Sequence, residues 1–214
     1  MENKISSGPF NFLLMGRSGC GKGTQAELLI KYLSGNNLGG TLYIYTGNKI
    51  RELAGKNNSL TSRLAKEIML AGNIEPSFIS VWSWCDDLVK NMKEDNNLIM
   101  DGSPRMLSEA KMIDEAFDFY KRRNVKPIFI ETSEKWSMEK LLKRGRVDDK
   151  KEVIKHRLDY FDKCVQPVID YYEKESKYKL IRVNGEQSIE EVNREIIKKC
   201  FNVLPCRYLR IRKK

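Results

Sequence analysis

The chain has 214 residues, 41% of them hydrophobic, and a formal net charge of +10 at pH 7. This length suits a single domain, and the apolar fraction is high enough for a packed core, which argues against wholesale disorder. No apolar stretch approaches the roughly 20 residues of a membrane span, and the first residues do not resemble a secretory signal. We therefore expect a cytoplasmic protein that does not associate with a membrane.

The positive charge and the cysteines limit the choice of partners further. A basic chain suits nucleic acid, but polyphosphate substrates explain the charge equally well. The basic residues concentrate at 140–146 and in the tail 205–214, where a solvated terminus is expected. The five cysteines are odd in number and show no Cys-x-x-Cys spacing, which argues against a disulfide framework or a four-cysteine zinc site.

Strand and helix patterns alternate along the chain. The pattern predicts five short apolar strands, at 10–15, 41–45, 98–100, 127–131 and 179–183. Helical patterns are found at 24–33, 59–71, 77–93, 107–122, 135–143, 151–175 and 189–201. This order predicts an α/β fold with a five-stranded parallel sheet covered by helices on both faces, in three layers. Ligands of such sheets bind beyond the carboxyl ends of the strands.

Residues 16–24 form a glycine-rich turn between the first predicted strand and the first predicted helix. Glycines let successive N–H groups point at one anion, the helix N-terminus adds positive potential, and Lys22 can reach outer phosphates. Gly23 stands where a magnesium-binding Ser or Thr usually follows the lysine, and the hydroxyl comes one residue later at Thr24. We therefore expect phosphate oxygens and water molecules to be the main ligands of the metal ion.

Arginines follow several other strands and turns of the predicted ligand edge. They occur in 46–51, which reads Thr-Gly-Asn-Lys-Ile-Arg, in 101–105, which reads Asp-Gly-Ser-Pro-Arg, and in 144–149, which reads Arg-Gly-Arg-Val-Asp-Asp. Arg157 lies eight residues beyond the last of these segments. Guanidinium groups suit phosphate oxygens, and a transferring phosphoryl group needs its charge neutralised.

With these motifs, the chain resembles the adenylate kinases among the nucleoside monophosphate kinases, from about residue 10 to residue 200. The resemblance implies one P-loop kinase domain, with a helical NMP-binding insertion and a very short lid. Its expected parts are a core at 1–45, 76–143 and 150–204, an NMP-binding segment at 46–75, a lid at 144–149 and the basic tail at 205–214. It implies reversible phosphoryl transfer from Mg·ATP to AMP, giving two ADP.

The resemblance also implies roles for individual residues. ATP would be bound by Gly19, Cys20, Gly21, Lys22, Gly23, Thr24, Arg144 and Gln187. AMP would be bound by Thr46, Arg51, Asn73, Ile74, Glu75, Gly102, Arg105, Glu109, Arg146 and Arg157. The catalytic groups would be Lys22, Arg105, Arg144, Arg146 and Arg157. Asp101 would orient Mg²⁺ through water, and Asp148 and Asp149 would pair with ribose or with the closing arginines.

Two departures from the family pattern leave alternatives open. The lid is too short to hold zinc, so we expect no zinc, and ATP is either sequestered less well or shielded by other parts of the structure. Glu109 stands where adenylate kinases place glutamine, and a carboxylate accepts hydrogen bonds but does not donate to adenine N1. A CMP, UMP or GMP kinase of the same fold is therefore the alternative. A non-catalytic nucleotide-binding or RNA-binding protein is a more distant alternative, because a binder has no need for arginines that neutralise a transferring phosphoryl group. We do not expect nucleic acid as a partner. We expect a monomer.

Overall fold

The fold is built on a five-stranded parallel sheet. The computed structural model describes residues 8–56, 58–146 and 149–202. Its strands are β1 (Phe10–Met15), β2 (Thr41–Tyr45), β3 (Asn97–Asp101), β4 (Asn124–Glu131) and β5 (Ile181–Asn184). They lie in the order β2-β3-β1-β4-β5, and every neighbouring pair is parallel. This arrangement confirms the predicted α/β class and the parallel sheet.

The central strand β1 is buried on both faces, and its side chains alternate between two cores. Phe12 and Leu14 belong to one hydrophobic cluster, whereas Leu13 and Met15 belong to the other. This follows from the period of two in a strand, and it explains why the sequence of β1 is an unbroken apolar run.

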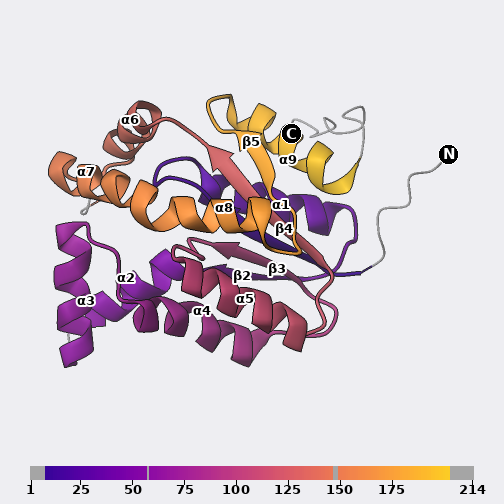
Figure 1. Cartoon of the computed structure of the whole chain (residues 1–214), viewed down its shortest axis with the longest axis horizontal. Helices are drawn as coiled ribbons and strands as arrows, with labels where there is room; N and C mark the ends of the chain where they lie inside the picture. The colour runs from indigo at the N-terminus through magenta and orange to yellow at the C-terminus, as the bar shows by residue number, and fades with distance from the viewer. Residues whose placement is uncertain (1–7, 57, 147–148, 203–214) are drawn as a thin grey trace, which may run out of the picture.

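Helices cover both faces of the sheet and complete three layers (Figure 1). One face packs against α1 (Lys22–Gly35) and α9 (Ile189–Phe201). The other face packs against α4 (Ser77–Asn91), α5 (Leu107–Phe119) and α8 (Gln166–Lys174). None of the helices in the described ranges is long and apolar enough to span a bilayer.

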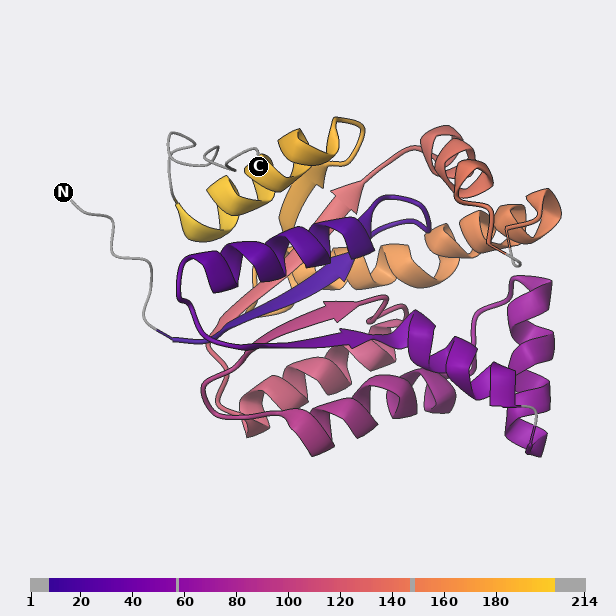
Figure 2. The ribbon, with the colours of Figure 1, turned by 180° about the vertical axis from the view of Figure 1, so that it is seen from behind.

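Four further helices lie at the end of the sheet where its strands finish (Figure 2). They are α2 (Thr46–Lys56), α3 (Leu60–Ala71), α6 (Glu134–Arg144) and α7 (Lys151–Tyr160). Ser59 caps α3 by accepting a hydrogen bond from the Ser62 N–H, and Gly72 ends that helix in a left-handed conformation. These helices surround the edge at which a doubly wound sheet binds its ligands.

Two segments differ from the periodicity expected of the sequence. Residues 46–56 form a helix directly after β2. The family resemblance implied a helical insertion here, although the periodicity of the sequence indicated no helix. The long pattern at 151–175 is interrupted by a π-helical turn at Phe161–Val165 before α8. Pro167 lies in the first turn of α8 and has no N–H to donate, so a continuous α-helical ladder is not possible at this point.

Candidate active site

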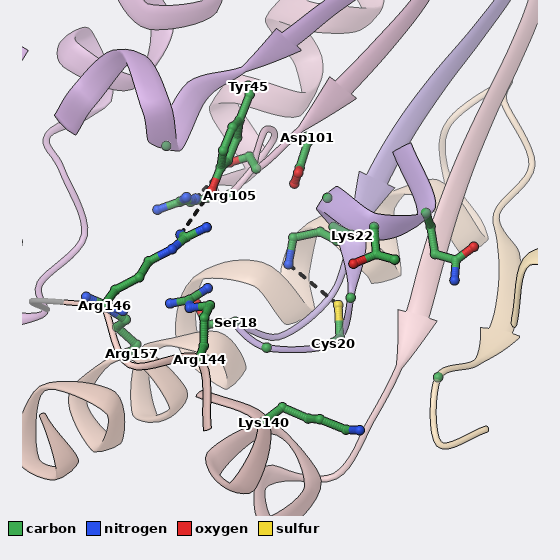
Figure 3. Close-up of a pocket in the computed structure, with 18 of the residues that line it drawn as sticks. Ser18, Cys20, Lys22, Tyr45, Asp101, Arg105, Lys140, Arg144, Arg146 and Arg157 are labelled. Atoms are coloured by element: carbon green, nitrogen blue, oxygen red, sulfur yellow. Dashed lines mark hydrogen bonds between the residues drawn. The ribbon is translucent and has the colours of Figure 1, made fainter. Parts of the chain in front are cut away.

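A cavity of about 590 Å³ opens at the carboxyl ends of the strands. Its walls come from the glycine-rich turn, α2, the ends of β2 and β3, the lid and the turn after β5. Figure 3 shows Lys22 on one side of this cavity and Arg105, Arg144, Arg146 and Arg157 on the other. The topology therefore brings basic groups from distant parts of the sequence to one space.

The glycine-rich turn depends on backbone conformations that favour glycine. Gly19 has a φ of +87°, and a Cβ atom there would lie 2.8 Å from the Ser137 carbonyl oxygen. Gly21 also has a left-handed backbone and occupies the N-cap of α1. The turn consequently leads directly into a helix N-terminus, and the residues 18–25 line the cavity. This is the geometry of a phosphate cradle.

Lys22 spans the inside of this turn. Its Nζ donates to the carbonyl oxygens of Gly16 and Arg17, at 2.9 Å each, and contacts Cys20 Sγ at 3.5 Å. These contacts hold the ammonium group at the mouth of the cradle, where a phosphate chain would meet it (Figure 3).

Asp101 ends β3 and is only 3% exposed. Its Oδ2 accepts a hydrogen bond from the Tyr43 hydroxyl at 3.1 Å. Burial raises the pKa of this carboxyl group, and the nearby charge of Lys22 opposes that shift. Asp101 and the hydroxyl of Thr24 both line the cavity. These are the hard oxygen donors that suit Mg²⁺, directly or through water, so the residues present fit that ion.

Asp149 brings together three arginines, from the end of α6, from the loop that follows it and from α7. Its carboxylate accepts a bidentate pair of hydrogen bonds from Arg144, at 2.8 and 2.7 Å, and a third from Arg157 at 3.2 Å. The backbone N–H of Arg146 donates to the same group. Burial alone would raise the pKa of Asp149, but Arg144, the Arg146 N–H and Arg157 lower it. One buried anion therefore fixes three basic residues at the wall of the cavity.

Arg146 reaches across the cavity from the lid to the end of β2. Its guanidinium donates to the Tyr45 hydroxyl at 3.2 Å (Figure 3). Arg51 of α2 lies over the ring of the same tyrosine, 5.1 Å from its centroid. Burial would raise the pKa of Tyr45, yet hydrogen bonding to Arg146 and the charge of Arg51 lower it. The tyrosine thus connects the lid to the helical insertion.

Arg105 lies in the loop after β3. Its Nε donates to the Gly102 carbonyl oxygen at 2.7 Å, which orients the guanidinium toward the cavity. The fork of N–H groups that remains on Arg105 is suited to an anion.

Sequence comparisons identify the family of this arrangement. A sequence model described as adenylate kinase matches residues 14–177. The chain belongs to the adenylate kinase family. It is 30% identical to an adenylate kinase of Oenococcus oeni over 84% of this chain and 92% of the relative. It is also 32% identical to an adenylate kinase of Prochlorococcus marinus, over 86% and 94% of the two chains. A uridylate kinase of Saccharomyces cerevisiae is 30% identical over 86% of both chains.

Membership in this family confirms the prediction that the protein is an enzyme, a nucleoside monophosphate kinase. The observed sheet order β2-β3-β1-β4-β5 is the order typical of this family. Because adenylate and uridylate kinases are both among the relatives, family membership alone does not select the base of the acceptor.

The structure brings most of the predicted site residues to the cavity. Among the described residues, its lining includes Gly19, Cys20, Gly21, Lys22, Gly23, Thr24, Arg51, Asn73, Glu75, Asp101, Gly102, Arg105, Arg144, Arg146, Arg157 and Gln187. Asp149 lies behind them and holds the arginines. Asp148 lies outside the described residues, as does the basic tail.

Three residues expected at the monophosphate are not part of the described lining: Thr46, Ile74 and Glu109. The hydroxyl of Thr46 is buried and donates to the Asp101 carbonyl oxygen at 3.2 Å. Glu109 is 0% exposed, and its Oε1 accepts from the Ser80 hydroxyl and the Trp84 Nε1. Its Oε2 accepts from the Arg105 N–H at 2.6 Å. In the structure Glu109 therefore supports the backbone of Arg105 from behind the described lining, and its contact with the base stays a prediction.

Several lining residues were not predicted from the sequence, including Tyr43, Tyr45, Met69 and Tyr160. The two tyrosines alternate along β2 and precede the ligand edge, which is a signal that strand periodicity could have provided. Met69 and Tyr160 carry no such signal, because their position depends on how α3 and α7 pack.

The Asp149 cluster predicts a large effect of a single substitution. Asp149→Ala should lower kcat/KM by about 100-fold, since misplacing the arginines by about 1 Å has a cost of this size. Asp149→Asn should restore part of the activity because the amide oxygen still accepts. Steady-state kinetics on both variants measure the effect, with Asp159→Ala on the exposed side of α7 as the control. Equal activity of Asp149→Ala and the control would show that the cluster does not position the arginines.

Glu75 makes stability depend on pH. Burial raises the pKa of this carboxyl group from 4.5 to about 7, against the opposing charge of Arg105. The folded state therefore binds the proton more tightly than the unfolded state. Stability should fall as pH rises from 4.5 to 7, and stay reduced above 7.

We expect Glu75→Gln to remove this dependence. Relative to the wild type, the variant should gain at most about 3 kcal/mol in the free energy of unfolding between pH 4.5 and pH 8. Urea denaturation at pH 4.5 and 8 measures the difference. Parallel shifts of both proteins with pH would contradict the raised pKa.

Proposed function

We propose that this enzyme reversibly transfers the γ-phosphoryl group of Mg·ATP to a nucleoside monophosphate, with AMP as an acceptor. The observation that carries the proposal is the shared cavity, in which the phosphate cradle with Lys22 faces Arg105, Arg144 and Arg146. A transferring phosphoryl group would lie between them. Such a site needs no nucleophilic side chain, because catalysis of this reaction consists of positioning and charge stabilisation.

Each part of the cavity has a proposed task in the reaction. The cradle and Lys22 bind the phosphates of ATP, and Arg51 and Arg105 bind the monophosphate. Arg144, Arg146 and Arg157 stabilise charge on the group in transit. A magnesium ion held near Asp101 would neutralise phosphate oxygens and orient the phosphate chain.

We also propose that two segments exclude water from the reaction. These are the helical insertion at 46–75 and the short lid at 144–149. Arg146 already donates to Tyr45, the β2 residue directly before the insertion, and Arg51 of the insertion lies over the ring of that tyrosine. Closure of such segments protects a phosphoryl group from transfer to water.

The choice of AMP is supported by relatives named adenylate kinase. The relative named uridylate kinase keeps a pyrimidine acceptor as the alternative. A coupled assay of ADP formation from ATP with AMP, GMP, CMP and UMP tests the proposal. Turnover with AMP supports it, whereas inactivity with AMP and activity with another monophosphate would replace the acceptor. Inactivity with every monophosphate would overturn the proposed transfer.

A further inference from the structure

The turn between α3 and α4 places one acidic side chain in the wall of the cavity. Glu75 is 5% exposed and lines the cavity together with Met69 and Asn73. Its Oε2 is buried and has no hydrogen-bond partner among the described residues. A buried carboxylate oxygen without a donor is costly, and in a side chain that lines a ligand cavity it indicates a missing partner.

Glu109, the other buried glutamate of this region, has no such unsatisfied oxygen. Donors from Ser80, Trp84 and the Arg105 backbone already reach both of its oxygens. Of these two glutamates, Glu75 is therefore the one that still has capacity for a ligand.

The chemistry of a carboxylate limits what Glu75 can recognise. An ionised carboxylate only accepts hydrogen bonds, and its two oxygens match two adjacent donors. Guanine presents a ring N1–H beside its 2-amino group. Adenine and cytosine each present an amino group beside a ring nitrogen that accepts, and uracil presents one N–H between two carbonyl oxygens. Guanine is thus the base whose edge fits an ionised Glu75 best.

We propose that Glu75 is a specificity-determining residue of the monophosphate site and accepts hydrogen bonds from the N1–H and 2-amino groups of guanine, so that GMP is a second acceptor. This inference rests on the proposed function for the identity of the site. Arg105, on the neighbouring loop, is the charged group that acts on Glu75. The arginine would bind the phosphate of the nucleotide whose base Glu75 contacts.

The ionisation of Glu75 sets the conditions for a test. Burial raises the pKa of this carboxyl group to about 7, so at pH 8 most molecules carry the ionised acceptor. A protonated carboxyl group, in contrast, can donate to adenine N1 and accept from the adenine amino group. The same residue therefore permits AMP as well, most readily at lower pH.

The first experiment compares ligands that differ in donors. GMP has both donors, IMP has only the N1–H, and AMP has neither in this arrangement. We expect wild-type affinity at pH 8, measured by calorimetry, to fall about tenfold from GMP to IMP and further to AMP, since each hydrogen bond to a charged group has an effect of this size. Turnover in the coupled assay should follow the same order. Equal affinities, or an order with AMP first, would overturn the inference.

The second experiment removes the charge. Glu75→Gln should weaken GMP binding by about tenfold or more and leave AMP binding unchanged or stronger, because an amide both donates and accepts. Glu67→Gln, on the exposed side of α3, is the matched control. An unchanged ratio of GMP to AMP affinity in Glu75→Gln would refute the role of Glu75. If the variant does not fold, the comparison of GMP, IMP and AMP on the wild type tests that role instead.

The two proposals fail in different ways. If AMP is phosphorylated but GMP neither binds nor reacts, the Glu75 inference is wrong and the proposed function stands. If GMP binds through Glu75 but no monophosphate is phosphorylated, base recognition stands and the proposed transfer is wrong.

Discussion

Lys22→Met should lower kcat by about 100- to 1,000-fold, the effect of removing one preorganised donor from a transition state. The ammonium group lies at the mouth of the cradle, fixed by the carbonyl oxygens of Gly16 and Arg17. Methionine has a similar length and keeps the apolar stem, but it has neither charge nor donors. Charge that develops on the transferring phosphoryl group would then lack its cation. Single-turnover kinetics with saturating ATP isolate this step.

Two controls separate chemistry from folding in this experiment. Lys31→Met changes an exposed lysine on the same helix, α1, and should retain wild-type turnover. Thermal unfolding of Lys22→Met shows whether the turn keeps its structure without the two carbonyl contacts. A folded Lys22→Met protein with ordinary kcat would mean that the cradle does not bind the reacting phosphates.

Arg105→Ala should raise KM for the monophosphate by about 100-fold and change KM for ATP much less. Loss of a hydrogen-bonded charge pair in a partly buried site has this magnitude. The Gly102 carbonyl oxygen accepts from Nε and orients the guanidinium, and Glu109 Oε2 holds the backbone by accepting from the Arg105 N–H. Its side chain therefore reaches the cavity in a fixed direction. Initial rates over a grid of both substrates distinguish the two KM values.

Arg105→Lys sharpens this test, because it keeps the charge but loses the planar fork. We expect it to recover only part of the affinity for the monophosphate. Arg123→Ala, at an exposed position after α5, is the control for the loss of one positive charge. An equal rise of both KM values in Arg105→Ala would argue that Arg105 acts on the site as a whole and does not contact the monophosphate.

The sequence was sufficient for the framework of the fold. The runs 10–15 and 41–45 were predicted at the observed bounds of β1 and β2. For β1 the reason is burial on both faces, because such a strand needs no polar positions. The glycine-rich turn was also recognisable, since its left-handed glycines and lysine occur at fixed spacing. Local signals therefore predicted the cradle well.

Contacts between distant segments were harder to predict. Glu109 follows Arg105 at the spacing of a base-reading residue, but only the packing of α4 against α5 brings Ser80 and Trp84 to its carboxylate. The burial of Glu75, which leaves Oε2 without a donor among the described residues, likewise depends on tertiary structure, because Glu75 lies in the turn between α3 and α4. No local sequence pattern shows that both oxygens of Glu109 have hydrogen-bond donors whereas Oε2 of Glu75 has none in the part of the chain that the structure describes.

Residues 46–56 illustrate a second limit. Gly47 and Gly55 weaken the helical propensity of this segment, so its sequence resembles a loop. In the structure, contacts with α3 and α4 stabilise the helix α2. Tertiary packing thus overrides a weak local preference, as it does for many amphipathic helices.

We propose that one cavity holds both nucleotides end to end. A bisubstrate compound, in which ATP and a nucleoside monophosphate are joined through their terminal phosphates, tests this most directly. Equilibrium binding should show one molecule per chain, with competition against both ATP and the monophosphate. Two molecules per chain, or displacement by ATP alone, would contradict the shared cavity.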